Sequence, residues 1–269
     1  MRKVLQILKF DLMQGIVRRW YVYVLAVAAA AFWAMDSRLS LWWETGHPGM
    51  LDMMVYALQG MEEYVPQKGV TFEVPFRYMT MFGLMGLSAS QYACREWKDR
   101  GRLYLLLYGD KRIWWFGKCV WSLCNTLLLY VAGVLTFWLV AAIGGNGSMA
   151  VSPSLSENLK IPLMYQDSKT IALYILVLGG ITVTALSQLQ VTLQVLFSPV
   201  LGFIIYMAVL ISSVYYMSPY FMGNSLMLLR TRLFTEEGIS LVPGIMIGVT
   251  VWVASAILGM ILVNRKDVL

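Results

Sequence analysis

Residues 95–118 read REWKDRGRLYLLLYGDKRIWWFGK and form the most strongly charged part of a chain that is otherwise apolar. This segment carries seven basic residues, and the apolar run LYLLLY lies in its middle. A run this short cannot span a membrane, because crossing roughly 30 Å of hydrocarbon takes about 20 apolar residues. We therefore expect the segment to stay on one side of a membrane, between two apolar segments that cross it.

The composition predicts an integral membrane protein. Of the 269 residues, 59% are hydrophobic and only 13% are charged, whereas soluble domains average about 25% charged residues. We expect a multi-pass protein of the cytoplasmic (inner or plasma) membrane, without a soluble domain. The thiols of Cys94, Cys119 and Cys124 have no metal-ligand spacing, and we expect buried, unpaired side chains.

The predicted fold is all-α, a single polytopic transmembrane domain over residues 1–269 with six membrane-spanning helices. The six apolar segments are residues 18–35, 76–94, 114–142, 170–192, 198–217 and 240–263. The fourth and fifth run together, and we expect the turn between them to be marked by Gln188, Gln190, Gln194 and Pro199. Arg77 lies close to the outer end of the second segment, where we expect its side chain to extend to the headgroups.

Basic residues predict the orientation. With the N-terminus inside, the cytoplasmic segments hold 14 of the 21 Lys and Arg residues, whereas the opposite side holds ten of the fifteen acids. The positive-inside rule therefore favours a cytoplasmic N-terminus and a cytoplasmic C-terminus.

Four segments outside the predicted spans have sequence patterns that predict further structure. Residues 1–17 carry apolar residues at helical spacing with basic residues at both ends, which predicts a helix in the inner headgroup plane; the alternative is that they extend the first span. Residues 36–75 form an external insertion, and residues 95–113 form the cytoplasmic loop. Residues 218–239 predict a short broken helix before the last span. The external insertion predicts an amphipathic helix resting on the spans, with its apolar stripe formed by Leu51, Met54, Val55, Leu58, Met61 and Val65.

Several kinds of chemistry have no candidate residues, and we expect no catalytic, metal-binding or cofactor-binding site in this chain. Its single histidine, His47, lies in the turn-like sequence ETGHPG. The stretch GDKRIWWFGK has the wrong glycine spacing for a phosphate-binding loop, and Cys119 stands where a magnesium-binding Ser or Thr is needed. No nucleic-acid partner is indicated.

The basic loop allows two interpretations. Leucines and tyrosines recur at helical spacing between Gly101 and Gly109, which predicts a short helix with an apolar face and charged ends. Such a helix could dock into a groove of a soluble partner. The alternative is an ordinary positive-inside loop whose leucines lie on the lipid surface.

The layout is similar to the membrane subunits of ABC transporters of the type-2 exporter class. In that family the loop often reads as an acidic residue, a glycine, a leucine-rich turn, an arginine, and then Gly-Lys at the start of span three. The matching residues here are Glu96, Gly101, Leu105–Leu107, Arg112 and Gly117–Lys118. Trp114, Trp115, Lys118 and Trp121 also resemble a pattern in a subset of such permeases from Gram-positive bacteria. Asp110 departs from the small residue or proline of many relatives, and the external helix is larger than a minimal member needs.

The resemblance implies a permease subunit that pairs with a separate ATP-binding subunit and with a second permease chain, the same or a sister. ATP and Mg²⁺ would bind to the partner subunit, and this chain would not be an enzyme. The residues expected to couple to the ATPase are Arg95, Glu96, Gly101, Arg102, Leu103, Leu106, Leu107, Asp110 and Arg112. Lys118 is expected to extend to the inner headgroups instead.

A polar, aromatic face on the fifth span suggests a substrate path formed by Tyr206, Ser212 and Ser213; the alternative is an interfacial belt. Small residues of the sixth span, Gly244, Gly248, Ser255 and Gly259, could pack against a second chain or, as we favour, within one chain.

The second hypothesis for the whole protein is a non-transporting membrane adaptor or sensor that recruits a cytoplasmic partner.

Overall fold

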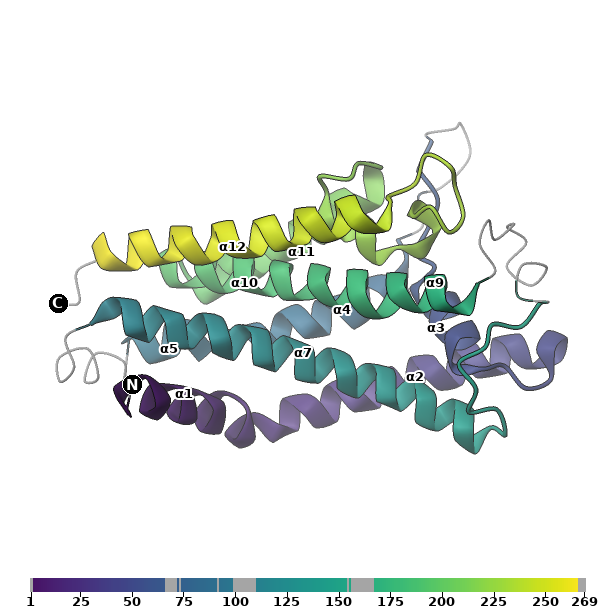
Figure 1. The fold of residues 1–269 in the computed structure, drawn as a ribbon, viewed down its shortest axis with the longest axis horizontal. Helices are drawn as coiled ribbons and strands as arrows, with labels where there is room; N and C mark the ends of the chain where they lie inside the picture. Colours follow the sequence, from purple (N-terminus) through teal and green to yellow (C-terminus); the bar gives the residue numbers. More distant parts are fainter. Residues whose placement is uncertain are drawn as a thin grey trace.

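The computed structural model of the chain describes residues 2–65, 72, 74–90, 92–98, 110–153, 155 and 167–265. These residues form an elongated helical bundle whose long helices run along its longest axis (Figure 1). The starts of α1 and α7, and the end of α12, lie at one end of the bundle, and α3 lies at the other (Figure 1). In the described part of the chain the only pairing of β type is an isolated bridge between Thr231 and Ile239, so the all-α prediction is confirmed.

Four helical stretches are long and apolar enough to cross a membrane, as expected of a multi-pass membrane protein. They are Val4–Trp43, Lys111–Ile143, Ser168–Leu196 and Leu241–Arg265. A fifth apolar helix, Pro199–Tyr215, is shorter.

The chain begins with α1 (Arg2–Gly15), which continues through the single turn η1 (Val17–Arg19) into α2 (Trp20–Thr45). This continuity agrees with the alternative that the first helix extends the first span, whereas its place in the headgroup plane stays a prediction. The helix α2 continues to Thr45, well beyond the predicted end at residue 35, and ends where Gly46 has a φ of +71° and Pro48 follows two residues later. The predicted external insertion therefore starts inside this helix.

The helix predicted in the external insertion is α3 (Met50–Leu58). All its side chains except that of Tyr56 are buried, so it does not rest on the bundle with one face exposed. The Asp52 carboxylate caps its first turn, accepting from Gly49 N at 3.0 Å, and also accepts from Ser152 N at 2.9 Å. The helix ends before Gly60, whose φ of +72° favours glycine, so Met61 and Val65 of the predicted stripe lie beyond it.

The second predicted span consists of two helices, α4 (Phe76–Ala89) and α5 (Tyr92–Lys98), with extended backbone at Ser90 between them. The third is the long helix α7 (Lys111–Ile143), which begins where the Asp110 carboxylate accepts from Arg112 N at 2.9 Å.

The fourth predicted span contains α9 (Ser168–Ala172), the π-helical segment η2 (Leu173–Gly179) and α10 (Gly180–Leu196). The Tyr130 hydroxyl donates to the carbonyl of Ile175 at 2.5 Å, which provides a partner for a carbonyl in the irregular segment. The turn before α11 (Pro199–Tyr215) lies at Phe197 and Ser198. The prediction that three glutamines mark this turn is wrong: they lie within α10 and are buried.

The segment between α11 and α12 contains two short helices, η3 (Met222–Leu226) and η4 (Leu228–Arg230), which agrees with the broken helix predicted there. Arg230 is fully buried there and fastens three parts of the chain together. Its guanidinium donates to Met61 O at 3.1 Å and Val214 O at 2.6 Å, and also to oxygen atoms of Glu62, Ser213, Tyr216 and Asn224. The last helix, α12 (Leu241–Arg265), packs on α10 and α7.

Candidate functional site

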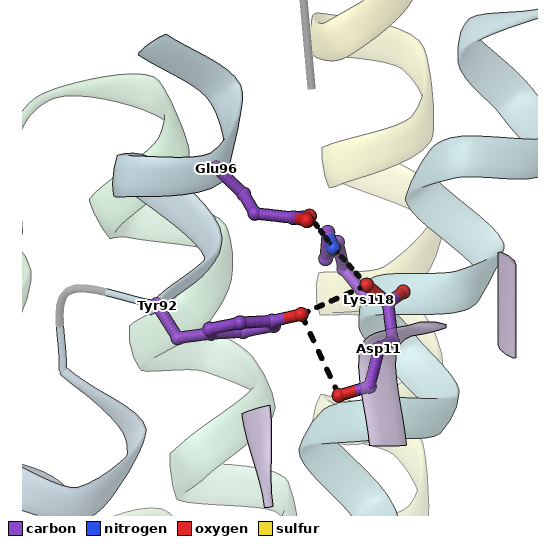
Figure 2. A network of polar contacts seen from close by, with 4 residues as sticks. All are labelled: Asp11, Tyr92, Glu96 and Lys118. Carbon is purple, nitrogen blue, oxygen red and sulfur yellow. Dashed lines mark hydrogen bonds and ion pairs between the residues drawn. The ribbon is translucent and has the colours of Figure 1, made fainter. Parts of the chain in front are cut away.

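Three helices bring charged side chains together in the interior, at the end of the bundle where the basic loop begins. Asp11 comes from α1, Glu96 from α5 and Lys118 from α7 (Figure 2). Tyr92 lies one turn before Glu96 on α5, and therefore faces the same way. We call these four residues the charge cluster.

Lys118 lies at the centre of the charge cluster. Its ammonium group donates to Asp11 Oδ1 and to Glu96 Oε2, so one cation joins carboxylates from two other helices. The Tyr92 hydroxyl also donates to Asp11 Oδ1, at 3.0 Å (Figure 2). The rings of Tyr92 and Trp114 lie 4.9 and 5.2 Å from the Lys118 nitrogen, within the range of cation–π attraction.

Burial makes these charges interact strongly. Lys118 is 0% exposed, Asp11 1% and Glu96 9%. Two carboxylates share one ammonium group, so these three groups carry one more negative than positive charge when both acids are ionised. Accordingly, burial raises the pKa of Glu96, opposed by the nearby ammonium of Lys118 and reinforced by the Asp11 carboxylate. The other carboxylate oxygen of Asp11 is buried without a hydrogen-bond partner in the described part of the protein.

Tryptophans of the WWxxKxxW pattern surround the charge cluster. Trp115 is fully buried; its indole nitrogen donates to Ala256 O at 2.7 Å, and its ring fits against Gly259 of α12. Trp121 packs against Tyr92 with ring centroids 4.5 Å apart, and Gly15 of α1 leaves room for it. The pattern therefore builds a small aromatic core around the lysine.

The prediction that Lys118 extends to the headgroups is wrong, because two buried carboxylates hold its ammonium group inside the bundle. Sequence reasoning missed Asp11 and Tyr92. The sequence does contain a signal for Asp11. It is the only acidic residue in a basic amphipathic helix, and such a helix needs no acid on its solvated face.

The predicted ATPase-coupling residues divide into three groups. Glu96 belongs to the charge cluster, and Arg95, Asp110 and Arg112 are exposed beside it. The others, Gly101, Arg102, Leu103, Leu106 and Leu107, lie outside the described residues.

Two of the three residues of the suggested substrate path use their hydroxyl groups within the chain. The buried Tyr206 hydroxyl donates to Phe82 O at 2.7 Å, and the buried Ser213 hydroxyl donates to Val209 O at 2.7 Å. Ser212 is partly buried on the same helix. A path along this face therefore stays a prediction.

Small residues of α12 pack within the chain, as favoured from the sequence. A side chain at Gly244 would meet Leu178, one at Gly248 would meet Ile181, and one at Gly259 would meet Trp115. Cys94 and Cys119 are buried, and Cys124 is half-buried.

Arg77 does not simply extend toward the headgroups. Its guanidinium pairs with Asp36 of α2 at 3.0 Å and donates to the Tyr56 hydroxyl at 3.2 Å.

In the described ranges no group of three His, Cys, Asp or Glu side chains could hold a metal ion.

Comparison with protein-family models, with curated proteins and with solved structures found no match to this chain. The resemblance to type-2 exporter permeases therefore stays a prediction based on the layout and the loop motif.

Proposed function

We propose that this chain is the membrane-spanning permease subunit of an ATP-driven exporter of the ABC type. It would lie in the cytoplasmic membrane with both ends inside, and a separate ATP-binding subunit would bind its basic loop. The six spans would be α2, α4 with the start of α5 up to residue 94, α7, the run α9–α10, α11 and α12. Two permease chains would assemble with two ATP-binding subunits.

The observation that carries this proposal is the position of the charge cluster at the base of the basic loop. The loop follows the end of α5 at Lys98, near Glu96, and leads into the start of α7 at Lys111, about two helical turns before Lys118. These two residues form an ion pair, and the same lysine binds Asp11 of α1. Separating buried opposite charges is costly, commonly about 3–5 kcal/mol for loss of one partner. A partner that moves the loop would therefore also displace α1, α5 and α7.

The experiment that tests the proposal is gentle purification of the tagged chain from its native membrane, with mass spectrometry of the proteins that accompany it. We expect a stoichiometric ATP-binding subunit. The double substitution Leu106→Asp and Leu107→Asp should release this subunit while the chain still inserts into the membrane. A control is Val65→Asp, which introduces one aspartate at an exposed residue of the predicted external segment.

Undiminished recovery of the ATPase with the double variant would disprove docking through the leucines. A preparation without any ATPase would instead favour the adaptor or sensor.

A further inference from the structure

A pocket of about 280 Å³ opens where α2, the end of α3 and the start of α4 meet. Its lining includes Trp33, Ala57, Gln59, Phe76 and Arg77. Most of this surface is apolar or aromatic, with a small number of polar groups, which is the usual character of a ligand site. The pocket shares no residue with the charge cluster, so it is a separate feature of the fold.

Arg77 supplies the pocket with unused hydrogen-bond donors. Among the described residues, its guanidinium contacts Asp36 and the Tyr56 hydroxyl, both through the same nitrogen, Nη2. Its Nε and Nη1 groups have no hydrogen bond to any residue in the described ranges, and the side chain is 26% exposed. A guanidinium presents its donors in a planar fork that matches a carboxylate or a phosphate.

The surroundings of Arg77 hold its guanidinium in place. The Tyr56 ring centroid lies 4.3 Å from Cζ and that of Trp33 lies 6.0 Å from it, so aromatic rings flank the cation. Because the side chain is positioned before any ligand arrives, binding would require little additional ordering.

The apolar walls require a ligand with an apolar portion. Phe76 is 67% exposed, and its ring contacts Trp33 edge to face at 5.9 Å. An exposed aromatic wall beside a cation suits a molecule that has an anionic group at one end and hydrocarbon at the other. A small inorganic anion would leave this wall unused.

We propose that this pocket binds an anionic amphiphile, a carboxylate or phosphate carried on an apolar chain, with Arg77 as the group that binds the anion. The molecule could be a lipid of the surrounding bilayer or a free fatty-acid-like compound, since both have the same chemistry. Asp36 competes for the same guanidinium and so weakens binding. This inference does not depend on the ATP-binding subunit.

The test uses the purified full chain in nanodiscs of zwitterionic phosphatidylcholine, with decanoate, dihexanoyl phosphatidate and inorganic phosphate as probes. Calorimetric titration should detect binding of the first two probes and much weaker binding of phosphate. We expect Arg77→Gln to lose about tenfold or more in affinity, because hydrogen bonds to a charged group are lost. Asp36→Asn should raise the affinity severalfold, because it removes a competing carboxylate.

Two further variants complete the test. Arg38→Gln removes an arginine of α2 that is not among the pocket residues, and should bind as the wild type does. Phe76→Ala changes an exposed side chain and should reduce the preference for decanoate over phosphate. Equal affinity of Arg77→Gln and wild type, or weaker binding by Asp36→Asn, would overturn the proposal.

The source of the ligand is distinguished by the bilayer composition. If anionic phosphatidylglycerol in the nanodisc suppresses decanoate binding, the site takes a membrane lipid. If decanoate binds equally well there, the site takes a free amphiphile.

Discussion

Lys118 places one positive charge between two carboxylates, so its removal leaves Asp11 and Glu96 buried without a counter-ion. We expect Lys118→Met to lower the free energy of unfolding by about 3–5 kcal/mol, the usual consequence of breaking a buried pair. The measurement is unfolding of the detergent-solubilised chain, followed by tryptophan fluorescence. Lys9→Met, an exposed lysine of α1, should change stability by no more than about 0.5 kcal/mol.

A triple variant tests whether unpaired buried charges explain this loss of stability. Lys118→Met combined with Asp11→Asn and Glu96→Gln should recover most of the lost stability, since no unpaired charge is then buried. If Lys118→Met alone is as stable as Lys9→Met, the ion pairs contribute nothing to the fold.

Glu96 should make stability depend on pH. Its pKa is raised in the folded protein, mainly by burial, so the folded state binds this proton more tightly than the unfolded chain does. The resulting stabilisation is fully present below the ordinary glutamate pKa of about 4.3 and is lost as the pH rises through the raised folded value. We therefore expect the free energy of unfolding of the wild type, relative to that of Glu96→Gln, to fall as the pH rises through that interval.

The control for the pH profile is Glu237→Gln, on an exposed turn. This variant should follow the wild-type profile. An unchanged profile for Glu96→Gln would show that the pKa of this carboxyl does not differ between the folded and unfolded states.

At the scale of a helix, α7 offers two glycines whose replacement should have opposite effects. A Cβ atom at Gly117 would lie 2.8 Å from Asp11 Oδ2 and 2.9 Å from Ile7 Cγ2, so Gly117→Ala would force α1 away from α7. We expect a loss of about 1–3 kcal/mol in the free energy of unfolding. At Gly133 nothing lies within 4 Å, and Gly133→Ala should stabilise the chain by about 0.5–1 kcal/mol through its helix propensity.

The two variants are compared in the same denaturation assay. Equal and small effects would mean that α1 does not pack closely on α7.

The orientation of the whole molecule can be tested at the two ends of α7. In a background without the three native cysteines, Met149→Cys lies just beyond one end, where Met149 is 56% exposed, and Arg112→Cys lies on an exposed position at the other. With a cytoplasmic N-terminus, an impermeant maleimide should label the first in intact cells and the second only after lysis. The reverse pattern would invert the proposed orientation.

The sequence by itself determined the helical class and the approximate course of the longest helices. Uninterrupted apolar runs predict α7 and α12 closely, because in hydrocarbon the backbone must satisfy its own hydrogen bonds and a helix does so locally. Clear breaks such as Gly46–Pro48 and Ser198–Pro199 end helices for reasons that are also local.

Only the tertiary structure decided which polar residues are buried and with which partners. Lys118 and Arg77 each look like side chains that extend to headgroups until acids from other helices, Asp11 and Asp36, are found beside them. The physical reason is that a buried charge is tolerated only with a partner, and the partner lies far away in sequence. Periodicity within one segment contains no information about that pairing, which arises when the helices pack together.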